Sequence, residues 1–135
     1  MVTVVCILIS CQVETTPQDP FPAVVRAMMI VESGCNPEAY RADEDALGAL
    51  QVRPGYLSDV NKFRARRGLK PYSRRDCKDP IKAIDMVREY TSTYARVKSR
   101  PWTAETISKI HNGGPMGWKK SSTTVYWNKI KGAMR

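Results

Sequence analysis

Glu32 is the residue of this chain whose position most clearly favours chemistry. It ends a stretch, residues 21–31, in which Phe21, Val25 and Met28 recur at helical spacing and place Glu32 on the same apolar face. A carboxyl group on such a face, near the end of a helix, is hard to ionise, so we expect the pKa of Glu32 to rise. An acid that stays protonated near neutral pH can donate a proton to a glycosidic oxygen. The alternative is a helix-end glutamate whose carboxylate is simply solvated.

The loop that follows, residues 36–52, carries further acidic residues within reach of Glu32 along the chain. Glycoside cleavage commonly uses two carboxyl groups about 5 to 9.5 Å apart. Asp43 and Asp45 are our first candidates for the second carboxylate, ahead of Glu44. Acidic residues in a surface loop are usually only solvated, which is the alternative for all three.

The composition is that of one globular domain with a basic surface. A chain of 135 residues can build one sizeable core, and a hydrophobic content of 42% is ordinary. No apolar segment is long enough to span a bilayer, and a single histidine cannot form a His-rich metal site. The formal net charge of +9 predicts attraction to polyanions such as nucleic acid, anionic lipid or an anionic bacterial wall.

The first eleven residues are apolar and differ from the rest of the chain. We assign residues 1–20 to an export leader with its linker and residues 21–135 to the mature domain. Residues 8–11 (LISC) resemble the bacterial lipoprotein cleavage box, in which the cysteine, here Cys11, receives a lipid. No Lys or Arg precedes the apolar run, which departs from that pattern, and a first strand is the alternative.

Two cysteines, Cys35 and Cys77, belong to the predicted mature domain, and each lies in a loop beside a predicted helix. In an exported domain such a pair could form one disulfide. Two buried thiols are the alternative.

The chain after residue 20 is predominantly helical in its pattern. A second helix is predicted from Pro54 to Gly68, and Asp79 is expected to cap a helix with an apolar face from Ile81 to Val97. The other expected elements are a helix over 104–111, a turn over 112–115, a last helix capped by Ser122 or Thr123, and a small β element over 46–52. The predicted class is therefore α-rich with a small β element.

Two blocks of the sequence resemble known families. The first, residues 32–37 (ESGCNP) and 46–52 (ALGALQV), resembles the start of lysozyme-like domains, including the soluble lytic transglycosylases. The second comprises residues 110–117 (IHNGGPMG), 121–123 (SST) and 126–130 (YWNKI), and it closely resembles the invertebrate-type lysozymes and destabilases. The blocks occur in the right order and leave the basic middle of the chain unmatched.

The resemblance implies a lysozyme-like fold with a substrate cleft beside a small β-hairpin. It implies that Glu32 is the general acid, and the family's second carboxylate corresponds to Asp43 here. Because the loop is shorter than in the family, Asp45 or Glu44 could take that place. In lytic transglycosylases the glutamate acts alone and the 6-hydroxyl of the sugar attacks, which gives an anhydro product.

The resemblance also implies substrate contacts around this acid. Gln51, Asn112 and Tyr126 would line the cleft, with Ser33 beside the reacting centre. Tyr56 could stack on a sugar ring, although aromatic residues at helical spacing usually belong to the core, as we expect for Trp127. His111 is more often a satisfied helix-end residue than a proton shuttle. The candidate substrate-binding residues are Ser33, Gln51, Tyr56, His111, Asn112 and Tyr126.

We therefore predict an exported, monomeric enzyme that cleaves peptidoglycan glycan strands as a lysozyme or a lytic transglycosylase, without a metal or an organic cofactor. Few cysteines in the mature part favour a bacterial or phage-like relative over an animal one. One alternative is a basic helical protein that binds nucleic acid through residues 64–67 and 74–75, although no binding motif supports it. The other is a non-catalytic wall-binding domain on the lysozyme scaffold.

Overall fold

The structure is a computed structural model that describes residues 17–135. The predictions for the apolar leader and for a lipid on Cys11 lie outside the described residues. The elements are α1 (Phe21–Ser33), β1 (Tyr40–Arg41), β2 (Ala46–Leu47), α2 (Pro54–Arg66), η1 (Arg74–Lys78), α3 (Pro80–Val97), α4 (Ala104–Gly113), η2 (Gly117–Lys119) and α5 (Ser121–Ala133). The predicted α-rich class with a small β element is confirmed.

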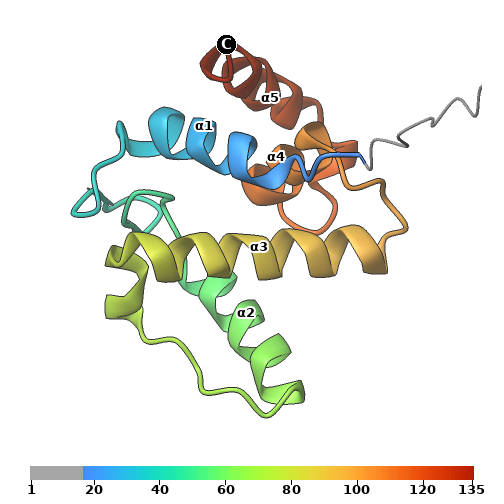
Figure 1. The fold of residues 1–135 in the computed structure, drawn as a ribbon. Coiled ribbons are helices and arrows are strands. Elements are labelled where there is room, and N and C mark those ends of the chain that lie inside the picture. Colours follow the sequence, from blue (N-terminus) through green and yellow to red (C-terminus); the bar gives the residue numbers. More distant parts are fainter. Residues whose placement is uncertain (1–16) are drawn as a thin grey trace, which may run out of the picture.

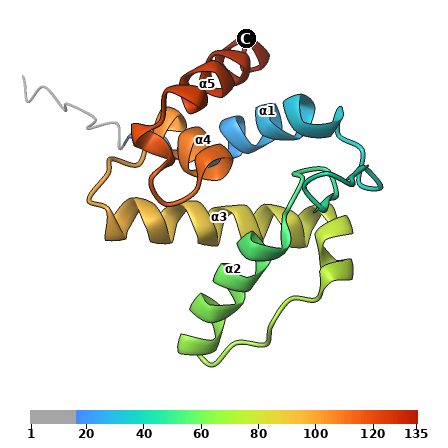
Figure 2. The same ribbon diagram turned by 180° about the vertical axis from the view of Figure 1, so that it is seen from behind.

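The longest helix, α3, crosses the middle of the molecule. Figure 1 shows α2 on one side of α3 and α1, α4 and α5 on the other, and the view from behind in Figure 2 shows the same order. One core joins the five helices, because each contributes side chains with no exposed surface: Val24 and Met28, Val60, Met86 and Val87, Ile107 and Ile110, and Ile130. Within residues 17–135, no helix combines the length and apolar character needed to cross a bilayer.

Side-chain capping marks the start of α3 and of α4, which Asp79 and Thr103 cap. The Asp79 carboxylate accepts hydrogen bonds from the backbone N–H groups of Ile81 (2.9 Å) and Lys82 (3.3 Å), as predicted. Asp19, which we assigned to the linker, accepts a hydrogen bond from the N–H of Phe21 at 3.0 Å, across Pro20 at the N-cap position of α1. Gly34, with φ of 62°, ends α1.

The predicted apolar face of α3 is exposed at both of its ends. Ile81 is 74% exposed and Val97 is 61% exposed, so this part of the prediction is wrong. At about 100° per residue, Ile81 lies roughly 120° around the helix from Val87 and therefore off the buried face. Val97 is the final residue of the helix, beyond Ala95, its last buried position.

The boundary between α4 and α5 also differs from the prediction. The helix continues to Gly113, so the turn is shorter than expected, and Gly114 ends the helix with φ of 82°. Thr123 lies inside α5 and does not cap it, because its hydroxyl donates to the carbonyl of Gly117 at 2.6 Å. The helix starts after Lys120, which makes no side-chain cap.

Candidate functional site

Glu32 points into the protein between three helices. Its side chain is only 14% exposed. Its Oε1 atom accepts a hydrogen bond from the hydroxyl of Tyr126 on α5 at 2.9 Å, and Nε2 of His111 on α4 lies 3.5 Å from the same oxygen. The apolar face that we predicted from Phe21, Val25 and Met28 is buried, so the inward orientation of this acid follows from its place on α1.

The pKa of Glu32 is lowered, which corrects the predicted rise. Burial raises the pKa, as expected, but the hydrogen bond and the charge of His111 outweigh that effect, together with the hydrogen bond from Tyr126 and the charge of Arg41. The sequence pattern shows the burial of Glu32 but not its partners, which come from distant positions in the chain.

A second tyrosine extends this arrangement. The hydroxyl of Tyr56 lies 2.9 Å from Nδ1 of His111, whose side chain is 4% exposed, and the Tyr56 ring stacks on Tyr90 with 3.6 Å between centroids. His111 can present an N–H on Nε2 to Glu32 in either of two arrangements: Tyr56 donates to a bare Nδ1, or a protonated Nδ1 donates to the Tyr56 hydroxyl. We call Tyr56, His111, Glu32 and Tyr126 the Glu32 network.

Both tyrosines of the network remain protonated at neutral pH. Burial raises the pKa of Tyr56 well above its usual value. Burial, with the nearby charge and hydrogen bond of Glu32, likewise raises the pKa of Tyr126. Tyr56 and His111, which we considered as sugar-binding residues, are buried in this network, where they can hold and polarise the acid. Only the folded structure shows this link, because the residues lie on different helices.

Ser33 and Gln51 hold the loop that follows the acid. The Ser33 hydroxyl donates to the carbonyl of Ala49 at 2.8 Å, which ties the end of α1 to that loop. The buried Gln51 amide donates to the carbonyls of Ala39 (3.2 Å) and Gly48 (3.0 Å), so it closes the turn after β2. These contacts are structural, and sugar binding by either residue stays a prediction.

Asn112 sits beside the network at the end of α4. Its backbone carbonyl accepts a hydrogen bond from the Arg53 guanidinium at 3.4 Å. Its side chain is half-buried. Its role in sugar binding therefore also stays a prediction.

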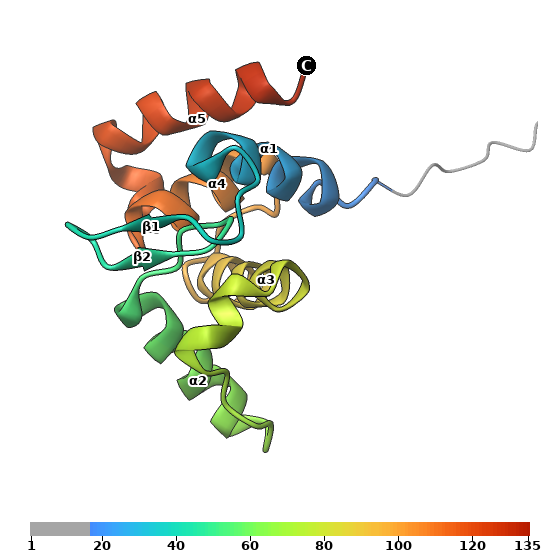
Figure 3. The same ribbon diagram turned by 90° about the vertical axis from the view of Figure 1, so that its left-hand side faces the viewer.

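The β1–β2 hairpin carries the candidate second carboxylates. Tyr40 pairs with Leu47 and Arg41 with Ala46 in antiparallel register, and Figure 3 shows the hairpin between α1 and the start of α2. Asp43, Glu44 and Asp45 all lie exposed in its turn. The charge of Arg41 on β1 contributes to the lowered pKa of Glu32, so the hairpin lies within electrostatic range of the acid.

The three acidic residues differ in their partners. Glu44 pairs with Arg41 at 3.5 Å, and Asp45 pairs with Arg74 at 2.8 Å. Among residues 17–135, no side chain forms an ion pair or hydrogen bond with the Asp43 carboxylate. Asp43 is therefore the residue of the turn whose carboxylate is free to meet a ligand.

The disulfide that we considered is not formed. Cys35 is exposed and Cys77 is buried, and both are free thiols. Cys77 faces the core, where its sulfur lies 4.0 Å from that of Met86, and burial raises its pKa. Cys35 follows the end of α1 in the solvent, so the two side chains occupy different environments. In the described part of the chain, no group of three His, Cys, Asp or Glu side chains is placed to hold a metal ion.

Curated proteins with similar sequences are lysozymes. No protein-family model matches the chain. The chain is 32% identical to a lysozyme of Magallana gigas over 111 residues, which cover 80% of this chain and 76% of that protein. It is 34% identical to invertebrate-type lysozyme 6 of Caenorhabditis elegans over 107 residues, which cover 75% of this chain and 78% of that protein.

Solved structures agree with these relatives. The Tapes japonica lysozyme superposes with a TM-score of 0.69 at 27% identity, covering 81% of this chain and 86% of that one. The Meretrix lusoria lysozyme, solved in complex with PliI of Aeromonas hydrophila, gives a TM-score of 0.70 at 26% identity over 82% of this chain and 87% of the matched chain.

Proposed function

The chain belongs to the family of invertebrate-type lysozymes, and on this premise we propose that it cleaves the β-1,4 bond between MurNAc and GlcNAc in peptidoglycan. The observation that supports this most directly is the largely buried Glu32 carboxyl, held by a tyrosine and a histidine. The purified domain should clear a suspension of bacterial peptidoglycan. Absence of clearing, with a folded protein, would overturn the proposal.

We propose that Glu32 donates the proton to the bridging oxygen. Both Tyr126 and His111 approach Oε1, so Oε2 is the atom that can carry the proton to the substrate. As the bond breaks, the carboxylate that forms is stabilised by the same two partners, which makes Glu32 a stronger acid. Bound glycan would exclude water from the carboxyl group and favour its protonated form before the reaction.

We propose Asp43 as the second carboxylate. Its neighbours in the turn are engaged by Arg41 and Arg74, whereas Asp43 is not paired within residues 17–135. An ionised Asp43 would stabilise the oxocarbenium-like centre or attack it. If the 6-hydroxyl of the sugar attacks instead, the reaction is that of a lytic transglycosylase and Asp43 is not required as a nucleophile.

The assignment of Asp43 is tested by neutral replacements in the turn. We expect Asp43→Asn to lower kcat/KM on peptidoglycan about a hundredfold, since it removes a charge that the transition state needs. Asp45→Asn is the matched control, and it should change kcat/KM only a few-fold. The reverse order would assign the role to Asp45. Mass analysis of the products then separates hydrolysis from anhydro formation, since the anhydro product is lighter by one water.

Tyr126→Phe tests whether Glu32 acts as the proton donor. The replacement removes a hydrogen bond that lowers the pKa of Glu32, so this pKa should rise. If Glu32 must be protonated to react, the pH above which kcat/KM declines should move upward. Tyr94→Phe is the matched control, because Tyr94 donates to another carboxylate, Asp59, at 2.8 Å.

The same variant has a predicted effect on stability. Because the pKa of Glu32 is lowered in the fold, its ionised form stabilises the protein above the unfolded-state pKa. This contribution is lost as the pH falls through the folded-state pKa. In Tyr126→Phe the acid-induced loss of stability should therefore be smaller. An unchanged pH profile of both activity and stability would show that Tyr126 does not control this acid.

We propose that the enzyme is exported and acts as a monomer. The apolar residues 1–11 and the wall substrate support export. We further propose that the exported protein carries a lipid on Cys11. Mass spectrometry of the mature protein from a bacterial expression host would identify the cleavage position and any lipid. A full-length, unprocessed protein in the cytoplasm would contradict export.

A further inference from the structure

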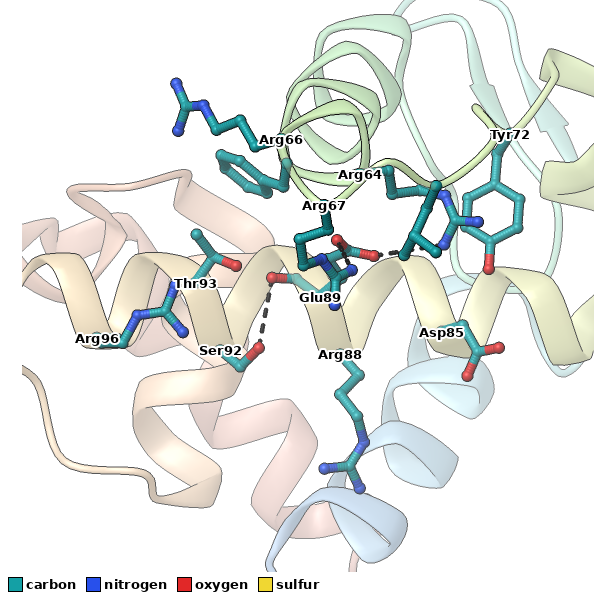
Figure 4. A pocket seen from close by; sticks show the side chains of 12 residues that line it. Arg64, Arg66, Arg67, Tyr72, Asp85, Arg88, Glu89, Ser92, Thr93 and Arg96 are labelled. Carbon is teal, nitrogen blue, oxygen red and sulfur yellow. Dashed lines mark hydrogen bonds and ion pairs between the residues drawn. The ribbon is translucent and has the colours of Figure 1, made fainter.

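A basic cavity lies between α2 and α3. It has a volume of about 510 Å³, and Figure 4 shows side chains from both helices around it. No residue of the Glu32 network lines it. Its charged lining residues are five arginines and two acids: Arg64, Arg66, Arg67, Arg88, Arg96, Asp85 and Glu89.

Some of these charges neutralise one another. The Glu89 carboxylate, 12% exposed, pairs with Arg64 at 3.7 Å and with Arg67. Arg64 also lies over the Tyr72 ring, 4.0 Å from its centroid. Arg88 is engaged at the rim by Asp19, at 2.7 Å. These contacts support the wall of the cavity and engage Arg64, Arg67 and Arg88, whereas Asp85, the other acid of the lining, forms no ion pair within residues 17–135.

Arg66 and Arg96 are the surplus cations. Within residues 17–135 neither forms an ion pair, and both are exposed. Figure 4 shows them at one end of the cavity with Thr93, whereas Asp85, the other acid, lies at the opposite end. Guanidinium groups bind phosphate through two parallel hydrogen bonds, and a nearby hydroxyl can add a third.

A second cavity, whose lining carries four basic residues and three acids, is more nearly balanced in charge. It is also rich in basic residues, but three of them are paired there with acids on its own rim or beside it: Arg74 with Asp45, Lys78 with Glu38, and Lys82 with Asp76. Among the described residues, the fourth basic residue of this lining, Arg75, forms no ion pair, whereas the cavity between α2 and α3 keeps two such cations, Arg66 and Arg96, at one end.

We propose that the end of the cavity at Arg66 and Arg96 binds phosphodiester groups of an anionic polymer attached to the bacterial wall. The choice of a wall polymer rests on the proposed function. We choose a polymer without nucleobases because the aromatic rings near the site already have partners. Arg64 covers Tyr72, and Phe63 makes an edge contact with Tyr94 at 5.4 Å between centroids. Binding of single-stranded nucleic acid usually adds stacking of bases on aromatic side chains.

The proposed site would keep the enzyme on the wall between cleavage events. It is separate from the reacting groups, so binding does not need turnover. Its strength should fall with added salt, because exposed charges are screened. The Glu32→Gln variant should bind the polymer as the wild type does, so failure of catalysis and failure of this site are distinguishable.

The test compares two double variants that remove the same charge. The double variant Arg66→Gln with Arg96→Gln removes both cations of the proposed site. The control variant Arg26→Gln with Arg75→Gln removes two exposed arginines outside this cavity. Binding to poly(glycerol phosphate) and to a single-stranded oligonucleotide of equal charge is measured by titration at several salt concentrations. We expect the first double variant to bind the glycerol phosphate polymer about tenfold more weakly, and the control pair to lose less than about threefold.

Replacement by lysine refines the result. Arg66→Lys with Arg96→Lys keeps the charge but loses the paired hydrogen bonds, so binding weaker than wild type supports a phosphate site. Equal losses in both glutamine pairs would overturn the proposal in favour of general charge attraction. Tighter binding of the oligonucleotide, with the same dependence on Arg66 and Arg96, would replace the wall polymer by nucleic acid. No binding by the wild type would exclude the site.

Discussion

Glu32→Gln is expected to lower the rate of peptidoglycan cleavage at least about a hundredfold, because general acid catalysis contributes roughly 10²–10⁴. Gln has the shape of Glu, and its amide oxygen can still accept the hydrogen bond from Tyr126. It has no proton of suitable acidity for a leaving oxygen. Clearing of a peptidoglycan suspension, followed by kcat/KM on purified glycan strands, measures the loss.

Glu38→Gln is the matched control for that experiment. Glu38 lies in the loop that follows α1, is exposed, and pairs with Lys78 on the surface at 3.2 Å. It should retain nearly the full rate, since exposed ion pairs contribute little. Clearing that survives in Glu32→Gln would exclude the proposed mechanism. Loss of clearing with retained wall binding would show that Glu32 supplies chemistry and not attachment.

Gly48→Ala is expected to destabilise the protein by about 3 kcal/mol or more, the range of the most severe single substitutions. Gly48 has φ of 86°, and a Cβ atom there would lie 2.0 Å from the backbone oxygen of Cys77. Backbone cannot move away as a side chain can, so either the Gly48 turn or η1, which contains Cys77, would have to shift. Urea unfolding, followed by circular dichroism, measures the change.

The control for Gly48→Ala is a glycine with free space around it. Gly132 lies in α5, and a Cβ atom added there would have no neighbour within 4 Å, so Gly132→Ala should stabilise the protein by about 0.5 to 1 kcal/mol. If Gly48→Ala were equally harmless, the close approach of the Gly48 turn to η1 would not hold in solution. In that case the position of Gln51, which lies in the same turn, would also need revision.

The helices of this protein could be predicted because their signals are local. A proline after Asp79, a threonine before Ala104 and a glycine after Ser33 act on their own backbone within one turn. Predictions of helix ends failed where a contact with a residue outside the helix determines the role of the predicted capping residue. Ser122 or Thr123 was expected to cap α5, but both lie inside the helix, and the Thr123 hydroxyl donates to the carbonyl of Gly117. The pattern shows a good capping residue and cannot show its partner.

The properties of the site also fall into those that the local sequence predicts and those that the packing of the helices determines. The order of residues alone places Glu32 on one face with Phe21, Val25 and Met28, since helical periodicity is a property of neighbouring residues. The direction of its pKa shift depends on the packed helices, because His111 and Tyr126 arrive from α4 and α5. Packing also keeps Cys35 and Cys77 apart and brings Arg66 and Arg96 to one cavity. Electrostatic shifts and pairings depend on separation in space, and the order of residues along a chain specifies that separation only after the helices have packed.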